Sequence, residues 1–170
     1  MTPELSNRIA EQVPESSSSY HRLILVVGPP RSGKTTALRL LAEECSWPMI
    51  NVNLLLSERL LELTTRQRSL NVPNILNQII RDHGDGILLL DNTEVLFSPE
   101  LQHDPLRLLQ GVTRNRTVIA SWAGEIDGEN LTYAEAAHPE FRRYQQPNTV
   151  IVSTLGEPNV KTPVGDKESA

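Results

Sequence analysis

The segment 28–35 reads Gly-Pro-Pro-Arg-Ser-Gly-Lys-Thr, a complete G-x-x-x-x-G-K-T phosphate-binding loop. An apolar run, residues 23–27, precedes this loop, and an amphipathic segment, residues 36–45, follows it. A strand, a loop and a helix in this order are the context that the motif requires. Gly28 and Gly33 allow the backbone to turn its N–H groups toward a phosphate, and the positive end of the following helix adds to the attraction. The segment therefore predicts an α/β fold that binds a nucleoside triphosphate.

Two side chains of the loop have specific expected roles. Lys34 is expected to reach the β- and γ-phosphates of ATP, and the Thr35 hydroxyl is expected to bind Mg²⁺. The residues expected to contact the nucleotide are Gly28, Pro29, Pro30, Arg31, Ser32, Gly33, Lys34, Thr35 and Thr36.

Length and composition fit one globular domain of 170 residues with a formal net charge of −5. This acidic balance argues against non-specific binding of nucleic acid through bulk charge, although it leaves room for a local basic face. The single cysteine, Cys45, cannot form an internal disulfide, and we expect it to be buried in the core. No apolar run approaches ~18 residues, and no signal peptide is recognisable, so we expect a cytoplasmic protein without a membrane segment.

Strand and helix patterns alternate after residue 20, which is typical of a parallel sheet flanked by helices. We expect an N-terminal helix with a serine-rich linker over 1–19, a P-loop NTPase domain over 20–155 and a disordered tail over 156–170. Five parallel strands are expected at 23–27, 49–52, 87–90, 117–122 and 149–152. Helices are expected at 2–13, 34–45, 54–63, 72–83, 105–111 and 138–144, with a polar connection at 64–71.

The second half of the site is expected at the end of the third strand, where three leucines, 88–90, are followed by Asp91. A carboxylate there can hold the hydration shell of Mg²⁺ opposite Thr35. Asn92 stands where many P-loop ATPases carry a glutamate that polarises the attacking water. An amide can hydrogen-bond a water but cannot accept its proton at neutral pH. We therefore expect slow hydrolysis, with Glu94 either a substitute carboxylate or a solvated loop acid.

Three further features are expected to respond to the γ-phosphate or to contact other molecules. Ser121 is either a polar sensor at the end of the fourth strand or a buried strand serine. Arg142 or Arg143 lies where ring-forming ATPases present an arginine to the neighbouring subunit's γ-phosphate, with a solvated helix face as the alternative. Arg114 and Arg116 precede the fourth strand at the edge opposite the nucleotide, where they contact nucleic acid phosphates or are solvated.

Several segments together resemble a specific family. They are LLLDNTEVLF (88–97), DPLRLLQG (104–111), TRNRT (113–117), LTYAE (131–135) and HPEFRRY (138–144). They resemble the BrxF family, small P-loop proteins of BREX bacteriophage-defence systems, over residues 20–153. The order of parts is more distantly similar to the AAA+ ATPase core, from which the chain departs at Asn92 and in lacking a helical lid after the fifth strand. The resemblance implies a role in phage defence together with other BREX proteins.

The leading hypothesis is an ATP-dependent assembly switch. Bound ATP would bridge copies of the chain or order residues 123–147, and so create a surface for DNA or a partner protein. The alternative is a small-molecule kinase of the nucleoside or nucleotide type, for which 64–71, with Arg66 and Arg68, is the one lid-like segment. A third hypothesis is a scaffold in which ATP is structural and is not turned over.

Overall fold

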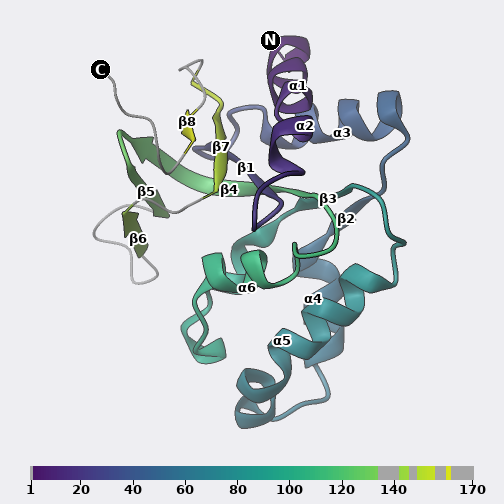
Figure 1. Cartoon of the computed structure of the whole chain (residues 1–170). Coiled ribbons are helices and arrows are strands. Elements are labelled where there is room, and N and C mark those ends of the chain that lie inside the picture. Colours follow the sequence, from purple (N-terminus) through teal and green to yellow (C-terminus); the bar gives the residue numbers. More distant parts are fainter. Residues whose placement is uncertain (1, 134–141, 146–148, 156–159, 162–170) are drawn as a thin grey trace.

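The computed structural model describes residues 2–133, 142–145, 149–155 and 160–161. These residues form one sheet with helices packed around it (Figure 1). Its parallel part has the order β2 (Met49–Asn51), β3 (Leu88–Asp91), β4 (Val118–Asp127), β1 (Leu23–Gly28) and β7 (Val150–Ser153). The predicted five-stranded parallel sheet is therefore confirmed, and β1 lies inside it, between β4 and β7.

Helices cover both faces of the sheet, and β1 is therefore buried along its whole length. Successive residues of β1 point to opposite faces. Ile24 and Val26 belong to the core under α1 (Thr2–Glu11) and α3 (Lys34–Cys45). Leu25 and Val27 belong to the core under the remaining long helices. These are α4 (Val52–Leu60), α5 (Thr65–Arg81) and α6 (Pro105–Gly111).

The N-terminal segment packs on this sheet. In α1, Leu5 and Ile9 are buried in the same cluster as Leu38 and Leu41 of α3. The short helix α2 (Val13–Ser16) follows, and Ser16 is fully buried. Residues 2–16 thus share a hydrophobic core with α3.

The prediction of a polar connection at 64–71 is wrong, because α5 begins at Thr65. Thr64 and Gln67 form a capping box, in which each side chain hydrogen-bonds the backbone N–H of the other. Pro73, inside this helix, has no N–H for the carbonyl of Ser69, four residues earlier. His103 supplies the missing partner through Nε2, 2.6 Å from the Ser69 carbonyl oxygen. A contact from outside the helix thus allows α5 to run through the proline.

The fourth strand is longer than predicted. Beyond Trp122 it continues as far as Asp127 and pairs antiparallel with β5 (Asn130–Tyr133) and, through it, β6 (Arg142–Gln145). A Cβ on Gly124 would overlap the carbonyl oxygen of Thr132, so this close pairing requires glycine. The rings of Phe97, Trp122, Tyr133 and Tyr144 pack together beneath the extension.

Three other predictions need correction. Residues 142–144 are strand rather than helix, while 138–141 lie outside the described residues. Within the tail predicted to be disordered, β8 (Val160–Lys161) pairs antiparallel with β7. Cys45 is exposed, because it is the last residue of α3.

Arg116 is neither solvated nor free for nucleic acid. It is 6 % exposed, and its guanidinium donates hydrogen bonds to the carbonyls of Ile80, His83, Gly84 and Gly86. These carbonyls lie at the end of α5 and in the turn to β3, so Arg116 joins that turn to the start of β4. Burial lowers the pKa of Arg116, and the charge of Asp85 acts in the opposite direction.

The described helices include none that is both long enough and apolar enough to cross a membrane.

Candidate nucleotide-binding site

The phosphate-binding loop joins the carboxyl end of β1 to the start of α3. Gly28 is the last residue of β1, and Gly33, with φ of 100°, immediately precedes the helix. Arg31 also has a positive φ, 64°. Pro30, Arg31 and Thr36 are exposed, whereas Gly28 and Lys34 are buried. The strand and the helix that were predicted to flank the loop are confirmed, and α3 begins at the predicted residue, Lys34.

The Lys34 side chain hydrogen-bonds the backbone of its own loop. Its Nζ donates hydrogen bonds to the carbonyl oxygens of Gly28, 2.8 Å away, and Pro29, 2.7 Å away, and the residue is 8 % exposed. Burial lowers the pKa of the Lys34 ammonium, while the negative charges of Glu94 and Asp91 raise it. The ammonium would have to leave the two carbonyls in order to reach a phosphate.

Thr35 and Asp91 are in direct contact, although 56 positions separate them in the sequence. The hydroxyl of Thr35 donates a hydrogen bond to Oδ2 of Asp91 over 2.7 Å. Thr35 stands in the first turn of α3, and Asp91 is the last residue of β3 and is 5 % exposed. A hydroxyl and a carboxylate oxygen at this separation are the hard oxygen ligands that suit Mg²⁺. The contact is compatible with a magnesium ion held between α3 and β3.

Asn92 follows Asp91 in a left-handed backbone conformation, with φ of 55°. Asparagine tolerates this conformation better than most residues that have a side chain. The carbonyl of Asn92 accepts a hydrogen bond from the N–H of Asn53 over 3.0 Å, which fixes the turn. Glu94 stands exposed in the first turn of the short 3₁₀ helix η1 (Thr93–Phe97). The backbone geometry thus gives a physical reason for an asparagine at the position that often carries glutamate.

Ser121 lies within β4 rather than at its end and is 2 % exposed. It is in register with Val26 of β1, and the preceding residue, Ala120, is in register with Leu90 of β3. By the alternation of strand side chains, Ser121 points to the same face as Asp91, and Trp122 to the other. Ser121 is therefore a buried strand serine that stands one strand away from Asp91, and its role as a sensor stays a prediction.

The two candidate arginines at 142 and 143 belong to β6, in register with Tyr133 and Thr132. Arg143 is exposed. Residues 142–145 form a strand instead of the predicted helix, and this strand pairs with β5.

Sequence analysis missed one residue beside the loop. Thr154, directly after β7, donates its backbone N–H to the carbonyl of Val27 over 2.8 Å. A Cβ on Gly28 would overlap the hydroxyl oxygen of Thr154 and lie 2.5 Å from that of Ser32. Only the pairing of β7 with β1 brings Thr154 to the loop, and no local pattern in the sequence signals this contact.

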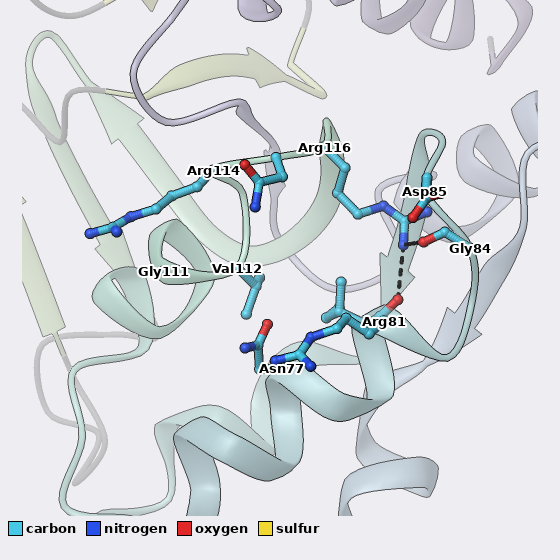
Figure 2. Close-up of a pocket in the computed structure, with 10 residues that line it drawn as sticks. Asn77, Arg81, Gly84, Asp85, Gly111, Val112, Arg114 and Arg116 are labelled. Carbon is cyan, nitrogen blue, oxygen red and sulfur yellow. Dashed lines mark hydrogen bonds between the residues drawn. The ribbon is translucent and has the colours of Figure 1, made fainter.

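A polar pocket of about 510 Å³ opens at the opposite edge of the sheet (Figure 2). Asn77 and Arg81 of α5 line one side of it, and the segment that leads into β4 lines another. Figure 2 shows the guanidinium of Arg116 turned toward Gly84, whereas the Arg114 side chain extends away from the turn.

One family of known proteins matches more than half of this chain. Residues 24–130 match the family described as ATPase family associated with various cellular activities (AAA). That span contains the phosphate-binding loop, Asp91 and Ser121. No curated protein matches the chain.

Solved structures similar to this chain include three AAA proteins. C. elegans PCH-2 is 22 % identical with a TM-score of 0.43, over 75 % of this chain and 38 % of its own. The FIGL-1 AAA domain in complex with ADP is 18 % identical with a TM-score of 0.38, over 66 % and 41 %. Katanin, from a study of its self-assembly, is 19 % identical with a TM-score of 0.43, over 88 % and 50 %. The chain spans half or less of the length of each.

The contact between Thr35 and Asp91 generates a first prediction. Replacing Thr35 by valine keeps the shape of the side chain but removes the hydroxyl that would bind Mg²⁺. We expect Thr35→Val to abolish the increase in ATP affinity that Mg²⁺ produces, with binding weakened about tenfold, and Thr35→Ser to retain it. Calorimetric titration with ATP, in Mg²⁺ and in EDTA, measures the difference. Equal magnesium dependence in the valine variant and the wild type would contradict the assigned role.

Proposed function

The chain belongs to the AAA family of ATPases, and from this premise we propose that it binds Mg·ATP and hydrolyses it slowly. The observation that carries the proposal is the 2.7 Å hydrogen bond between Thr35 and Asp91, next to the buried ammonium of Lys34. Residues 28–36 would surround the phosphates, and Thr35 and Asp91 would hold the magnesium ion. Lys34 would exchange its two carbonyl partners for phosphate oxygens.

Slow hydrolysis follows from the residues that surround the attacking water. Asn92 can orient a water molecule through its amide but cannot remove a proton from it. Glu94 is exposed, and its charge acts on Lys34, so it can stabilise the lysine without standing next to the γ-phosphate. Ser121 is the polar side chain that would respond to that phosphate from β4.

Restoring a carboxylate at position 92 tests this explanation. We expect Asn92→Glu to raise the turnover of ATP at least tenfold, because it provides a base where Asn92 provides none. Asn92→Gln is the matched control: it has the same length and the same backbone strain at φ of 55°, but no charge. Steady-state phosphate release measures both. If the two variants hydrolyse ATP at the same rate, the missing carboxylate is not the reason for slow turnover.

We further propose that ATP acts as an assembly switch. Arg143 is exposed on β6, beyond the hairpin that prolongs β4, and Arg142 is its neighbour on the same strand. An arginine in this position can reach a second copy of the chain and stabilise the charge of that copy's γ-phosphate. ATP and ADP would then differ in their affinity for the assembled state, which is the condition for a ligand to drive a switch. The BrxF-like segments support other BREX defence proteins as the partners of the assembled form.

The double variant Arg142→Ala with Arg143→Ala should lose ATP-dependent assembly and keep its affinity for ATP. The solution mass from light scattering, without nucleotide, with Mg·ADP and with Mg·ATP, shows the loss directly. Arg66→Ala with Arg107→Ala removes the same charge from exposed sites on α5 and α6 and should behave as the wild type. Weakened ATP affinity with unchanged assembly would sink the arginine assignment. A wild-type monomer in all three conditions would instead favour assembly on a partner protein.

A DNA contact is proposed at the polar pocket between α5 and β4. Arg81, Arg114 and Arg116 line the pocket, whereas Asp85 is the one acid among the residues that line it. Arg116 is engaged with backbone carbonyls, so Arg81 and Arg114, both exposed, would contact phosphates. This local positive charge contrasts with the net charge of −5 for the whole chain.

For this surface, Arg81→Ala with Arg114→Ala is expected to weaken binding of a 20-nucleotide DNA strand about tenfold at low salt. The slope of log affinity against log salt should also fall by about 1.4, since two phosphate contacts are lost and each contributes about 0.7 on a single strand. Fluorescence anisotropy measures both quantities, and the Arg66 and Arg107 double variant is the charge-matched control. Equal losses in the two double variants would show only a general effect of charge.

The kinase alternative needed the segment 64–71 as a lid over the phosphates. That segment caps α5 and forms its first turns, and Arg68 donates hydrogen bonds to the carbonyls of Leu60 and Leu63. The described residues thus offer no observation that favours phosphate transfer to a small molecule.

A further inference from the structure

Two buried hydroxyl groups, those of Thr154 and Ser32, lie behind the phosphate-binding loop. They occupy the space in which a side chain on Gly28 would stand. Thr154 comes from the strand beside β1, and Ser32 comes from the loop itself. The hydroxyl group of Thr154 is therefore the point at which the sheet touches the interior side of the loop.

Neither hydroxyl has a hydrogen-bond partner among the described residues, and both oxygen atoms are shielded from solvent. Buried polar groups in folded proteins almost always have a partner, because an unpaired group loses its hydration without compensation. The main chain of Thr154 is fixed beside the loop, since its N–H is bound to the carbonyl of Val27 and the next N–H, of Leu155, is bound to Ser153 Oγ. The pairing of β7 with β1 thus places the unpaired hydroxyl next to the loop.

Two carbonyl groups of the same loop have a hydrogen-bond donor now but would lose it when a nucleotide binds. The carbonyl oxygens of Gly28 and Pro29 have a donor at present, the Lys34 ammonium. When Lys34 turns to a phosphate, both carbonyls lose that donor. The two unpaired hydroxyls stand where a Cβ on Gly28 would lie, and nucleotide binding would leave the carbonyls of Gly28 and Pro29 without their donor.

We propose that Thr154 is a positioning residue for the phosphate-binding loop, whose hydroxyl gains a loop partner when Lys34 moves to the phosphates of ATP. Together with Ser32 it satisfies the rearranged backbone of residues 28–29. The hydroxyl is unpaired in the free protein and paired in the nucleotide-bound protein, so it favours the bound state. This inference rests on the proposed ATP binding and adds a residue that lies outside the G-x-x-x-x-G-K-T motif.

Removing the hydroxyl of Thr154 should have opposite effects on the stability of the free protein and on that of the nucleotide-bound protein. A valine at 154 has the shape of threonine and removes an unpaired polar group from the free protein, which should become more stable. The same change removes a hydrogen bond from the bound state, which should become harder to reach. A threonine that only supports the fold would change both quantities in the same direction.

We expect Thr154→Val to raise the melting temperature of the nucleotide-free protein by about 3 °C and to weaken ADP and ATP binding about fivefold. Thr154→Ser keeps the hydroxyl and should bind both nucleotides like the wild type. Differential scanning calorimetry without nucleotide and calorimetric titration with Mg·ADP and Mg·ATP provide the two readouts.

Thr113→Val is the matched control. Thr113 is a buried threonine, but its hydroxyl already donates to the carbonyl of Gln110 over 2.8 Å, and it lies before β4, at the other end of the sheet. Its valine variant should lower the melting temperature and leave nucleotide affinity unchanged. A Thr154→Val protein with unchanged affinity, or with both stability and affinity reduced, would overturn the proposal. A wild-type protein that binds no nucleotide would instead refute the proposed function, which the first titration tests on its own.

Discussion

The site depends on the position of β1 inside the sheet. Because β1 pairs with β4 on one side and β7 on the other, its carboxyl end brings the phosphate-binding loop between residues from both neighbours. Thr154 stands against Gly28 from β7, while Asp91 reaches Thr35 from β3, on the far side of β4. Gly28 is the narrowest point of this arrangement, since a side chain there would meet two hydroxyl groups at once.

Sequence alone predicted the parts of this arrangement that local patterns determine. Apolar runs identified the strands that are buried on both faces, and the loop motif identified the turn after β1 and the start of α3. Asp91 could be predicted because an acid at the end of a buried strand falls at the same edge of a parallel sheet as the loop. These residues depend on the order of strands and hardly at all on the details of packing.

The remaining features could not be predicted, because each depends on a partner far away in the sequence. The capping box of Thr64 and Gln67 was a local signal for the start of α5, whereas the contact of His103 that replaces the hydrogen bond lost at Pro73 is not local. β4 continues past Trp122 because Gly124 lets β5 approach, and Arg116 is buried because the end of α5 offers it carbonyl groups. In the same way Thr154 belongs to the loop only through the pairing of β7. Local sequence carries no signal for any of these contacts.

Asn92 links the fold to the chemistry that we propose. The turn after β3 places this residue at a positive φ and uses its carbonyl to hold the N–H of Asn53. Asparagine tolerates that backbone and cannot act as a base, so one residue accounts both for the turn and for the slow hydrolysis that we propose. A domain with this turn would keep ATP bound for longer than it would with a carboxylate at the same position. Long occupancy is the property that a switch requires, because the assembled state can persist only while the γ-phosphate remains.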